Sequence, residues 1–212
     1  MGAADMQLHT ISVVITANYH NPSILNNDFL VNNRIVPSDW EVDEAVSTPA
    51  VSVVRYKNGI NWLVDQQRLD ISKEYSIQFE NHDDGEIHGL AASYVRMLKH
   101  VPYQSIGLNC VVSVANEDPL QWMTKKFLSA KSYSEDVVMV PRFLIKTDGA
   151  LLNLGFGESS PQFNSTHAKS VIIQCNYHFD GPFESVEDMT KILSGWRDAK
   201  SIITSRLSEA LK

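Results

Sequence analysis

The chain has 212 residues, 43% of them hydrophobic and 20% charged, with 18 basic and 25 acidic residues and a formal net charge of −7. This composition is typical of a globular protein rather than a disordered one. No densely basic stretch is present, which argues against nucleic acid as a partner, because phosphate neutralisation requires a concentrated Lys/Arg surface.

We expect the protein to be cytoplasmic and not to contact a membrane. The first residues carry neither the charged region nor the apolar run of a secretory signal. No apolar stretch approaches the roughly 18 residues that a membrane-spanning helix needs. Cys110 and Cys175 are the two cysteines, each within a β-like run, so we expect two reduced thiols in the core rather than a disulfide framework.

The first predicted elements are a strand over Leu8–His20 and a short helix that begins at Pro22, a residue favoured in the first helical turn. The polar segment 32–49 is predicted to be a connection. It leads into the stretch 50–71, where two β-rich runs flank Asn58-Gly59. That dipeptide predicts a hairpin with a type I′ turn, in which both central residues have positive φ.

The remaining elements follow from hydrophobic periodicity and from capping and turn residues. In chain order they are a helix starting near Asp83, a strand over Ser105–Val114, a helix from Pro119 to about Ala130, a second hairpin of Val137–Ile145 and Ala150–Phe156 around Asp148-Gly149, a strand over Ser170–Phe179 and a long helix over Ser185–Leu211.

These elements predict an α+β fold: a largely antiparallel sheet of β-meanders packed against helices, including the long C-terminal helix. We expect a single domain over residues 1–212, with two pseudo-repeated halves, 1–101 and 102–212, as a further possibility. Two internal similarities suggest the halves. Ser12–His20 resembles Ser170–His178, and the hairpin at Asn58-Gly59 is echoed at Asp148-Gly149. Coincidence on a common strand pattern is the alternative explanation.

The internal similarity singles out one pair of candidate binding residues, His20 and His178, together with the adjacent Tyr19 and Tyr177. If the two strands were neighbours, both imidazoles and both phenols would meet at one end of the sheet, where histidine serves as a base, a ligand or a pH-sensitive contact. The alternative is that all four are strand-end surface residues. No catalytic residue is predicted.

A second histidine cluster consists of His82 and His88, which flank Asp83, Asp84 and Glu86. The residue types would suit a metal ion, but helix capping explains the same aspartates without any ligand. We therefore predict no metal and no cofactor.

The chain resembles an uncharacterised, sporadically distributed bacterial protein family of unknown function. The resemblance rests on Val54–Gly59, Val64–Leu69, Ile106–Asn109, Val171–Ile173 and the acidic turn Asp180–Pro182 before a long final helix. Where that family tends to have Arg-Tyr after Ile-Gly-Leu, this chain has Asn109-Cys110. The resemblance covers nearly the whole chain but implies no known activity and no catalytic residues.

Two functional hypotheses follow. The first is a non-enzymatic protein-binding or scaffold protein that acts through its sheet or its long helix, with a protein partner or a second copy of itself. An antiparallel sheet backed by helices also resembles SecB-like export chaperones at the level of fold analogy. The second is a hydrolase or small-molecule-binding enzyme that uses the sheet end with His20 and His178.

Overall fold

One antiparallel sheet forms the frame of the molecule. The computed structural model describes residues 6–82, 85–128, 139–159 and 169–211. Nine strands pair in the order β2-β3-β4-β5-β1-β6-β9-β8-β7, and every pairing is antiparallel. Their bounds are β1 Gln7–Ala17, β2 Val42–Ser47, β3 Val51–Tyr56, β4 Ile60–Asp65, β5 Arg68–Gln78, β6 Tyr103–Ala115, β7 Arg142–Thr147, β8 Ala150–Glu158 and β9 Ser170–Asp180. The predicted α+β class is confirmed.

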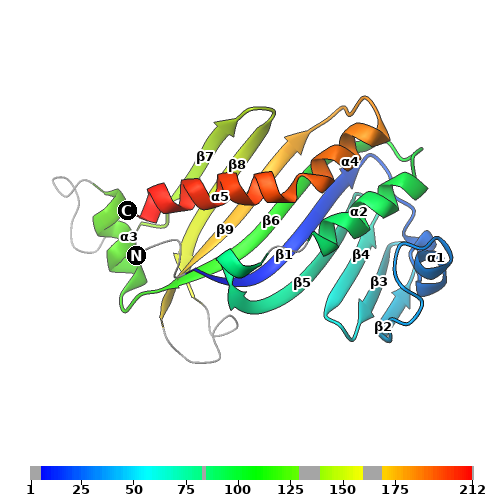
Figure 1. Cartoon of the computed structure of the whole chain (residues 1–212), viewed down its shortest axis with the longest axis horizontal. Helices are drawn as coiled ribbons and strands as arrows, with labels where there is room; N and C mark the ends of the chain where they lie inside the picture. The colour runs from blue at the N-terminus through cyan, green and yellow to red at the C-terminus, as the bar shows by residue number, and fades with distance from the viewer. Residues whose placement is uncertain (1–5, 83–84, 129–138, 160–168, 212) are drawn as a thin grey trace.

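The described helices cover one face of this sheet (Figure 1). They are the 3₁₀ helices η2 Pro22–Ile24 and η3 Phe79–Asn81 and the α-helices α1 Asn27–Asn32, α2 Glu86–Met97, α3 Pro119–Phe127, α4 Val186–Ser194 and α5 Trp196–Leu211. Helices α2 and α4 pack against each other across the middle of the sheet, and α3 packs against β8 at one end. The opposite face of the sheet carries no described helix, and we call it the open face.

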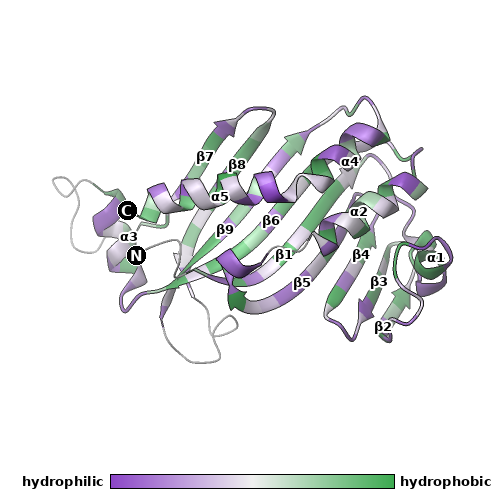
Figure 2. Cartoon of the chain, viewed as in Figure 1, coloured by the Kyte–Doolittle hydropathy of each residue, from purple (hydrophilic) through white to green (hydrophobic). Residues whose placement is uncertain are grey.

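The core lies between the sheet and the helices because the strands alternate. In β1, Leu8, Ile11, Val13 and Ile15 are buried, and the residues between them are partly exposed on the open face. The same alternation runs through β4, where Trp62 is fully buried and its ring centroid lies 5.9 Å from that of Tyr94 on α2. Figure 2 shows hydrophilic colour on the outer surfaces of α2 and α5, as expected for helices whose apolar stripe faces the core.

The two halves of the chain follow the same order of elements: a strand, a helical connection, a meander and a helix that packs on the sheet. The first strands of the halves, β1 and β6, pair antiparallel at the centre of the sheet, and each has its own meander beyond it. A pseudo-twofold axis normal to the sheet therefore passes between β1 and β6. It exchanges β1 with β6, β5 with β9, β4 with β8 and β3 with β7, and it leaves β2 without a counterpart.

This axis matches one internal similarity of the sequence and not the other. The two hairpins, β3-β4 and β7-β8, are exchanged by the axis, as their Asn-Gly and Asp-Gly turns suggested. The strands β1 and β9, which share the Ser-Val…Asn-Tyr-His pattern, are not exchanged. Since both pair with β6, they run parallel to each other with β6 between them.

The first hairpin turn differs from the prediction. Gly59 has positive φ, at 88°, whereas Asn58 does not, and the Gly59 amide donates to the Tyr56 carbonyl at 3.0 Å. The loop is therefore three residues long, a type I turn over Lys57 and Asn58 followed by a glycine in the left-handed region. The predicted type I′ turn is wrong because the Asn58 side chain accepts from the Ile60 amide at 3.1 Å instead of allowing a left-handed backbone.

Three further boundaries were predicted differently. The segment 32–49 contains the edge strand β2, whose exposed residues give no alternation to detect. The single C-terminal helix is two helices, because α4 ends at Ser194 and α5 begins at Trp196, with Gly195 between them. The predicted helix start at Asp83 lies outside the described residues, and the helix itself runs over Glu86–Met97.

No helix in the described part of the chain is long and apolar enough to cross a membrane. Cys110 and Cys175 lie directly opposite each other on β6 and β9, both buried and both free thiols. Their hydrogen bond, together with burial, raises the pKa of the Cys175 thiol.

Candidate functional site on the open face of the sheet

A row of mostly polar side chains crosses the open face from one edge of the sheet to the other. The row holds one residue from each strand, and neighbouring members are directly paired across the strands. In sheet order its members are Glu44, Arg55, Asn61, Ser72, Ser12, Asn109, Asn176, Asn153 and Leu144. We call these nine residues the polar row.

The pseudo-twofold axis passes through the centre of the polar row, between Ser12 and Asn109. Counted outward along the directly paired residues, the axis relates Ser72 to Asn176 and Asn61 to Asn153. Short hydroxyl side chains and amides therefore occupy the equivalent places of the two halves.

Hydrogen bonds tie the central members of the row together. The Asn176 side-chain amide donates to the Asn109 side-chain oxygen. The Asn109 amide in turn donates to the Ser12 hydroxyl at 3.4 Å and to the Gly107 carbonyl at 3.3 Å. Gly107 makes room for this arrangement, since a Cβ atom there would lie 2.8 Å from Nδ2 of Asn176. The centre of the open face is thus preorganised by its own amides.

The second half presents an oriented guanidinium. Nε of Arg142 donates to Oδ1 of Asn153 at 2.8 Å, which directs the rest of the group over the face. Among the described residues, no carboxylate lies within ion-pair distance of Arg142. As far as these residues are concerned, its remaining N–H groups are left to solvent or to a ligand.

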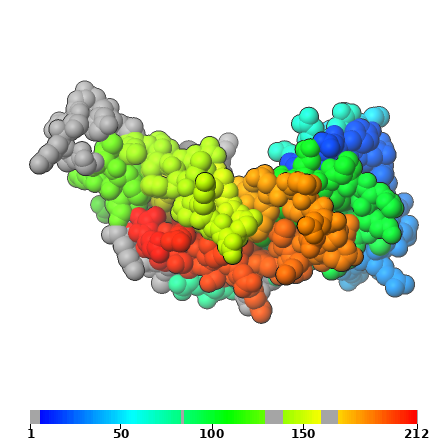
Figure 3. All heavy atoms as spheres, turned by 90° about the horizontal axis from the view of Figure 1, so that it is seen from above, coloured from blue at the N-terminus to red at the C-terminus, as the bar shows by residue number. Residues whose placement is uncertain are grey.

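Two shallow hollows flank the centre of the row. One, of about 490 Å³, is lined by residues that include Arg55, Asn61, Leu63, Asp70, Ser72 and Glu74. The other, of about 350 Å³, is lined by residues that include Asn109, Arg142, Asn153, Gly155, Gln174 and Asn176. We call them the first-half hollow and the second-half hollow. The pseudo-twofold axis exchanges them, and Figure 3 shows the molecule hollowed on the side away from α4 and α5.

The first-half hollow contains a carboxylate, that of Asp70, with no ion-pair or hydrogen-bond partner among the described residues. The side chain of Asp70 is half-buried on the open face and forms no hydrogen bond or ion pair with any described residue, apart from a longer-range attraction to Arg68. Burial consequently raises the pKa of Asp70, and Arg68 opposes that shift. The other cation of this hollow, Arg55, is already paired with Glu44 at the sheet edge.

The structure separates the four residues that the sequence singled out. His20 is buried after the end of β1, with Nε2 3.3 Å from the Ile15 carbonyl, and burial lowers its pKa. His178 lies on the open face with Nε2 2.9 Å from Oδ1 of Asp180. Tyr19 is 59% exposed, whereas Tyr177 is buried and bonded to the Thr147 hydroxyl at 2.9 Å.

The two histidines lie at the same end of the sheet, because β1 and β9 are parallel, but β6 separates them. Two strand spacings amount to about 10 Å, and His20 is buried whereas His178 is partly exposed on the open face. The described structure therefore does not bring the two imidazoles into one site. Whether any of the four residues binds a ligand singly stays a prediction.

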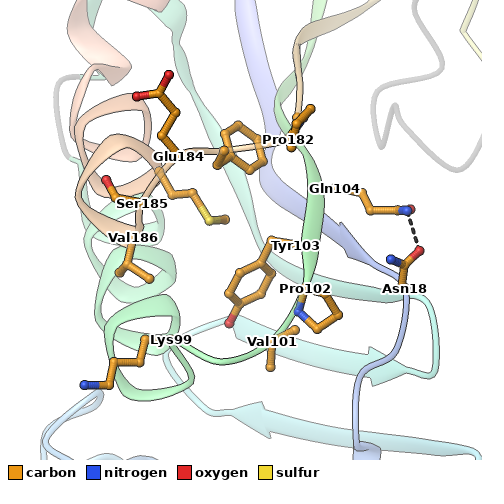
Figure 4. Close-up of a pocket in the computed structure, with 13 residues that line it drawn as sticks. Asn18, Lys99, Val101, Pro102, Tyr103, Gln104, Pro182, Glu184, Ser185 and Val186 are labelled. Atoms are coloured by element: carbon orange, nitrogen blue, oxygen red, sulfur yellow. Dashed lines mark hydrogen bonds between the residues drawn. The ribbon is translucent and has the colours of Figure 1, made fainter.

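A third pocket, of about 660 Å³, lies at this same end, between the connection from α2 to β6 and the connection from β9 to α4 (Figure 4). Tyr103 and Pro102 line one side, and Glu184 and Ser185 line the other. No histidine lines it. The hydroxyl of Tyr103 donates to the Leu98 carbonyl at 3.1 Å, so this phenol is held by the protein itself.

The other histidine cluster is structural where it is described. His88 is buried and stacks on Trp196 of α5 with a centroid distance of 4.4 Å. Burial, with a smaller contribution from His82, lowers the pKa of His88 to about 3. The described residues contain no group of three or more His, Cys, Asp or Glu placed to hold a metal ion. Asp83 and Asp84 lie outside the described residues.

No protein-family model matches the chain, and no curated protein matches it significantly. The resemblance to the uncharacterised bacterial family accordingly stays a prediction.

Sequence reasoning missed the polar row, although part of its pattern is visible. In the strand around Asn109 the apolar residues alternate with Gly107, Asn109 and Val111, which marks a second face without saying what it joins. The partners of Asn109 come from β1 and β9, and only the strand register reveals them.

Proposed function

We propose that this protein is a non-enzymatic binding protein that holds an extended polypeptide segment across the open face of its sheet. The observation that carries the proposal is the polar row. The described helices cover one face of the nine-stranded sheet, and the other face has a line of side chains that, apart from Leu144 at its end, donate or accept hydrogen bonds.

The chemistry of the row suits a peptide. Asparagine amides and serine hydroxyls each offer both a donor and an acceptor, which is what the N–H and C=O groups of an extended backbone require. Eight strand spacings of about 4.8 Å make the row about 38 Å long, which matches roughly 12 residues of extended chain at 3.3 Å per residue.

The charges of the face favour a polypeptide over nucleic acid. The chain carries a net charge of −7. The charged members of the two hollows are Arg55, Asp70 and Glu74 in the first half and Arg142 in the second, which does not make a basic surface. A phosphate backbone would need a concentration of Lys and Arg that this face lacks.

The second candidate is a small-molecule site at the sheet end, favoured by the 660 Å³ pocket, whose volume lies in the range of ligand pockets. The pocket is lined by Lys99, Tyr103 and Glu184 but by no histidine, which separates it from the residues that suggested an enzyme. A ligand there would be displaced by substitution of Glu184 and not by changes to the polar row.

Binding to a library of fluorescein-labelled, randomised 12-residue peptides tests the proposal. We expect the wild-type protein to bind a subset of these peptides, and the double variant Asn61→Ala/Asn153→Ala to bind them at least tenfold more weakly, because both equivalent amides of the row are lost. The matched control is Gln121→Ala, which removes an exposed amide from α3 on the covered side.

Two outcomes would overturn this function. The first is an absence of binding to every peptide of the library by the folded wild-type protein. The second is equal affinity of the wild type and the Asn61→Ala/Asn153→Ala variant, which would show that any bound peptide lies elsewhere. Loss of binding in Glu184→Ala alone would favour the pocket at the sheet end.

A further inference from the structure

The two hollows of the open face occupy equivalent places but carry opposite charges. The axis that relates Asn61 to Asn153 and Ser72 to Asn176 also relates Asp70 to Gln174, because Asp70 pairs with Leu63 and Gln174 with Gly155. The first-half hollow thus has a carboxylate where the second-half hollow has a neutral amide.

The reverse difference appears one strand further out. Val53 pairs with Leu63 in the first half, and Arg142 pairs with Gly155 in the second. The second-half hollow therefore has a guanidinium where the first-half hollow has valine. The absence of a side chain at Gly155 leaves open the space next to that guanidinium, since no atom lies within 4 Å of the place where its Cβ would be.

Neither of these charges has an ion-pair partner among the described residues. Asp70 and Arg142 make no ion pair with any described residue, whereas Arg55, Lys57, Arg68 and Lys73, all on strands or turns of the first half, are each paired with an acid. An uncompensated, half-buried carboxylate costs stability, as the raised pKa of Asp70 shows. A ligand cation at that point would remove this cost.

We infer that the open face selects peptides by charge: a carboxylate side chain of the ligand binds Arg142 in the second-half hollow, and a cationic side chain of the same ligand binds Asp70 in the first-half hollow. The inference rests on the proposed function, and it adds the chemical class of the ligand and its spacing.

The spacing follows from the sheet. Asp70 is on β5, and the pair of Arg142 and Asn153 is on β7 and β8, four to five strands away, or about 19–24 Å. A peptide lying across the strands advances about 3.3 Å per residue, and its alternate side chains point to the same side. The two charged side chains of the ligand should therefore be six residues apart, a separation of about 20 Å.

The chemistry of each end is ordinary. The guanidinium of Arg142, oriented by Asn153, can donate two parallel N–H groups to a carboxylate, and the nearby amides of Asn176 and Gln174 line the same hollow. At the other end Asp70 and Glu74 line the hollow together, and a Lys or Arg side chain could bind between them.

Four acetylated and amidated ten-residue peptides of Ser and Thr test the inference by fluorescence anisotropy at 0.15 M salt, where remote charges are screened. The matched peptide has a glutamate at its second position and a lysine at its eighth. The two-glutamate peptide and the two-lysine peptide have the same residue at both positions. The close-spaced peptide has a glutamate at its second position and a lysine at its fourth.

We expect the matched peptide to bind at least fivefold more tightly than each of the other three, because it alone places an anion at Arg142 and a cation at Asp70. The close-spaced peptide has the same composition and net charge as the matched peptide, so it isolates the spacing.

Charge reversal sharpens the test. In Arg142→Glu the preference should move to the two-lysine peptide, and in Asp70→Lys to the two-glutamate peptide. The double variant should again prefer the matched peptide, bound in the reverse direction. Lys125→Glu, an exposed reversal on α3, is the control and should change nothing. Should Asp70→Lys fail to fold, Asp70→Asn should abolish the preference for lysine over glutamine at the eighth position of the matched peptide.

The outcomes separate the two proposals. If all four peptides bind equally and all lose affinity in Asn61→Ala/Asn153→Ala, the open face binds peptides without reading charge, and this inference is overturned while the function stands. If binding follows the number of lysines alone, the acidic chain attracts cations non-specifically, and the inference is again overturned. If no peptide binds, both proposals fall.

Discussion

The two faces of the sheet are built from the same strands yet differ in what they do for the molecule. On the covered face of β4, Trp62 is fully buried and packs near Tyr94, while its neighbour Asn61 lies on the open face in the polar row. The covered face buries apolar area and so supplies most of the stability. The open face contributes less to stability, and its side chains are available to bind a ligand.

The difference also appears in how each face handles polar groups. On the open face, Asn109, Asn176 and Ser12 bond to one another at the surface. On the covered face, His88 and the indole N–H of Trp196 are buried with no hydrogen-bond partner among the described residues. The buried polar groups of His88 and Trp196 cost stability because they lack hydrogen-bond partners in the described part of the chain. The polar side chains of the open face lie at the surface, where they can also bind a ligand.

Substitutions on opposite faces of β4 test most directly whether the two faces differ in their contribution to stability. We expect Trp62→Ala to lower the free energy of unfolding by about 3–5 kcal/mol, because it removes a large, fully buried side chain. The adjacent change Asn61→Ala should stay within about 0.5 kcal/mol. Urea unfolding followed by circular dichroism measures both. Comparable losses in the two variants would contradict the division of labour between the faces.

Acid should act on the covered face through His88. The pKa of His88 is lowered to about 3 by burial, so the unfolded chain binds a proton there near pH 6.5 and the folded chain does not. Stability contributed by the neutral ring is present above pH 6.5 and is lost as the pH falls towards 3. The loss should reach about 2–3 kcal/mol by pH 4.5.

Urea unfolding at a series of pH values measures this loss, and His88→Phe is the matched variant, since a phenyl ring can keep the stacking on Trp196 without titrating. The variant should lack the His88 part of the acid destabilisation. A wild type and a variant whose stabilities fall in parallel between pH 6.5 and 4.5 would show that His88 is not responsible.

The elements of the covered face could largely be predicted from the sequence, because the residues that determine them are close together in the chain. Pro119 was predicted to begin a helix and does, with the Asp118 side chain accepting from the Gln121 amide at 3.1 Å. The C-terminal helix was predicted to start at Ser185, which caps α4 by accepting from the Asp188 amide at 3.1 Å. Each of these caps involves residues only a few positions apart in the sequence, and so does the alternation of period two in β6.

The polar row of the open face could not be predicted from the sequence, because the residues that form it are far apart in the chain. Ser12 and Asn109 are 97 residues apart, and nothing in either strand states which residue of the other it will face. The sequence pointed instead to His20 and His178, whose strands look alike but are separated by β6. Two strands with similar sequences have similar patterns of burial and pairing, but they need not be neighbours in the sheet.

Within the open face, Gly107→Ala tests whether the central amides form a preorganised unit. The new methyl group would lie 2.8 Å from Nδ2 of Asn176 and should displace that side chain from Asn109. We expect a loss of about 1 kcal/mol in the free energy of unfolding, the usual net value of one hydrogen bond. In an Asn176→Ala background the same substitution should cost almost nothing, and an undiminished cost there would place the strain in the backbone instead.

The smallest expected effect has the opposite sign. Asp70 has a raised pKa because burial disfavours its charged form, so the folded state loses stability as the pH rises through the unfolded and then the folded pKa of this carboxyl. Asp70→Asn removes the charge and should raise Tm slightly at pH 7. Glu74→Gln, an exposed change in the same hollow, should leave Tm unchanged. If Asp70→Asn lowers Tm, the carboxylate has a stabilising partner within the protein, and the open face has no unpaired anion to offer a ligand. If Tm rises, the chain retains at position 70 a residue that weakens its own fold, which is expected where a side chain serves binding rather than packing.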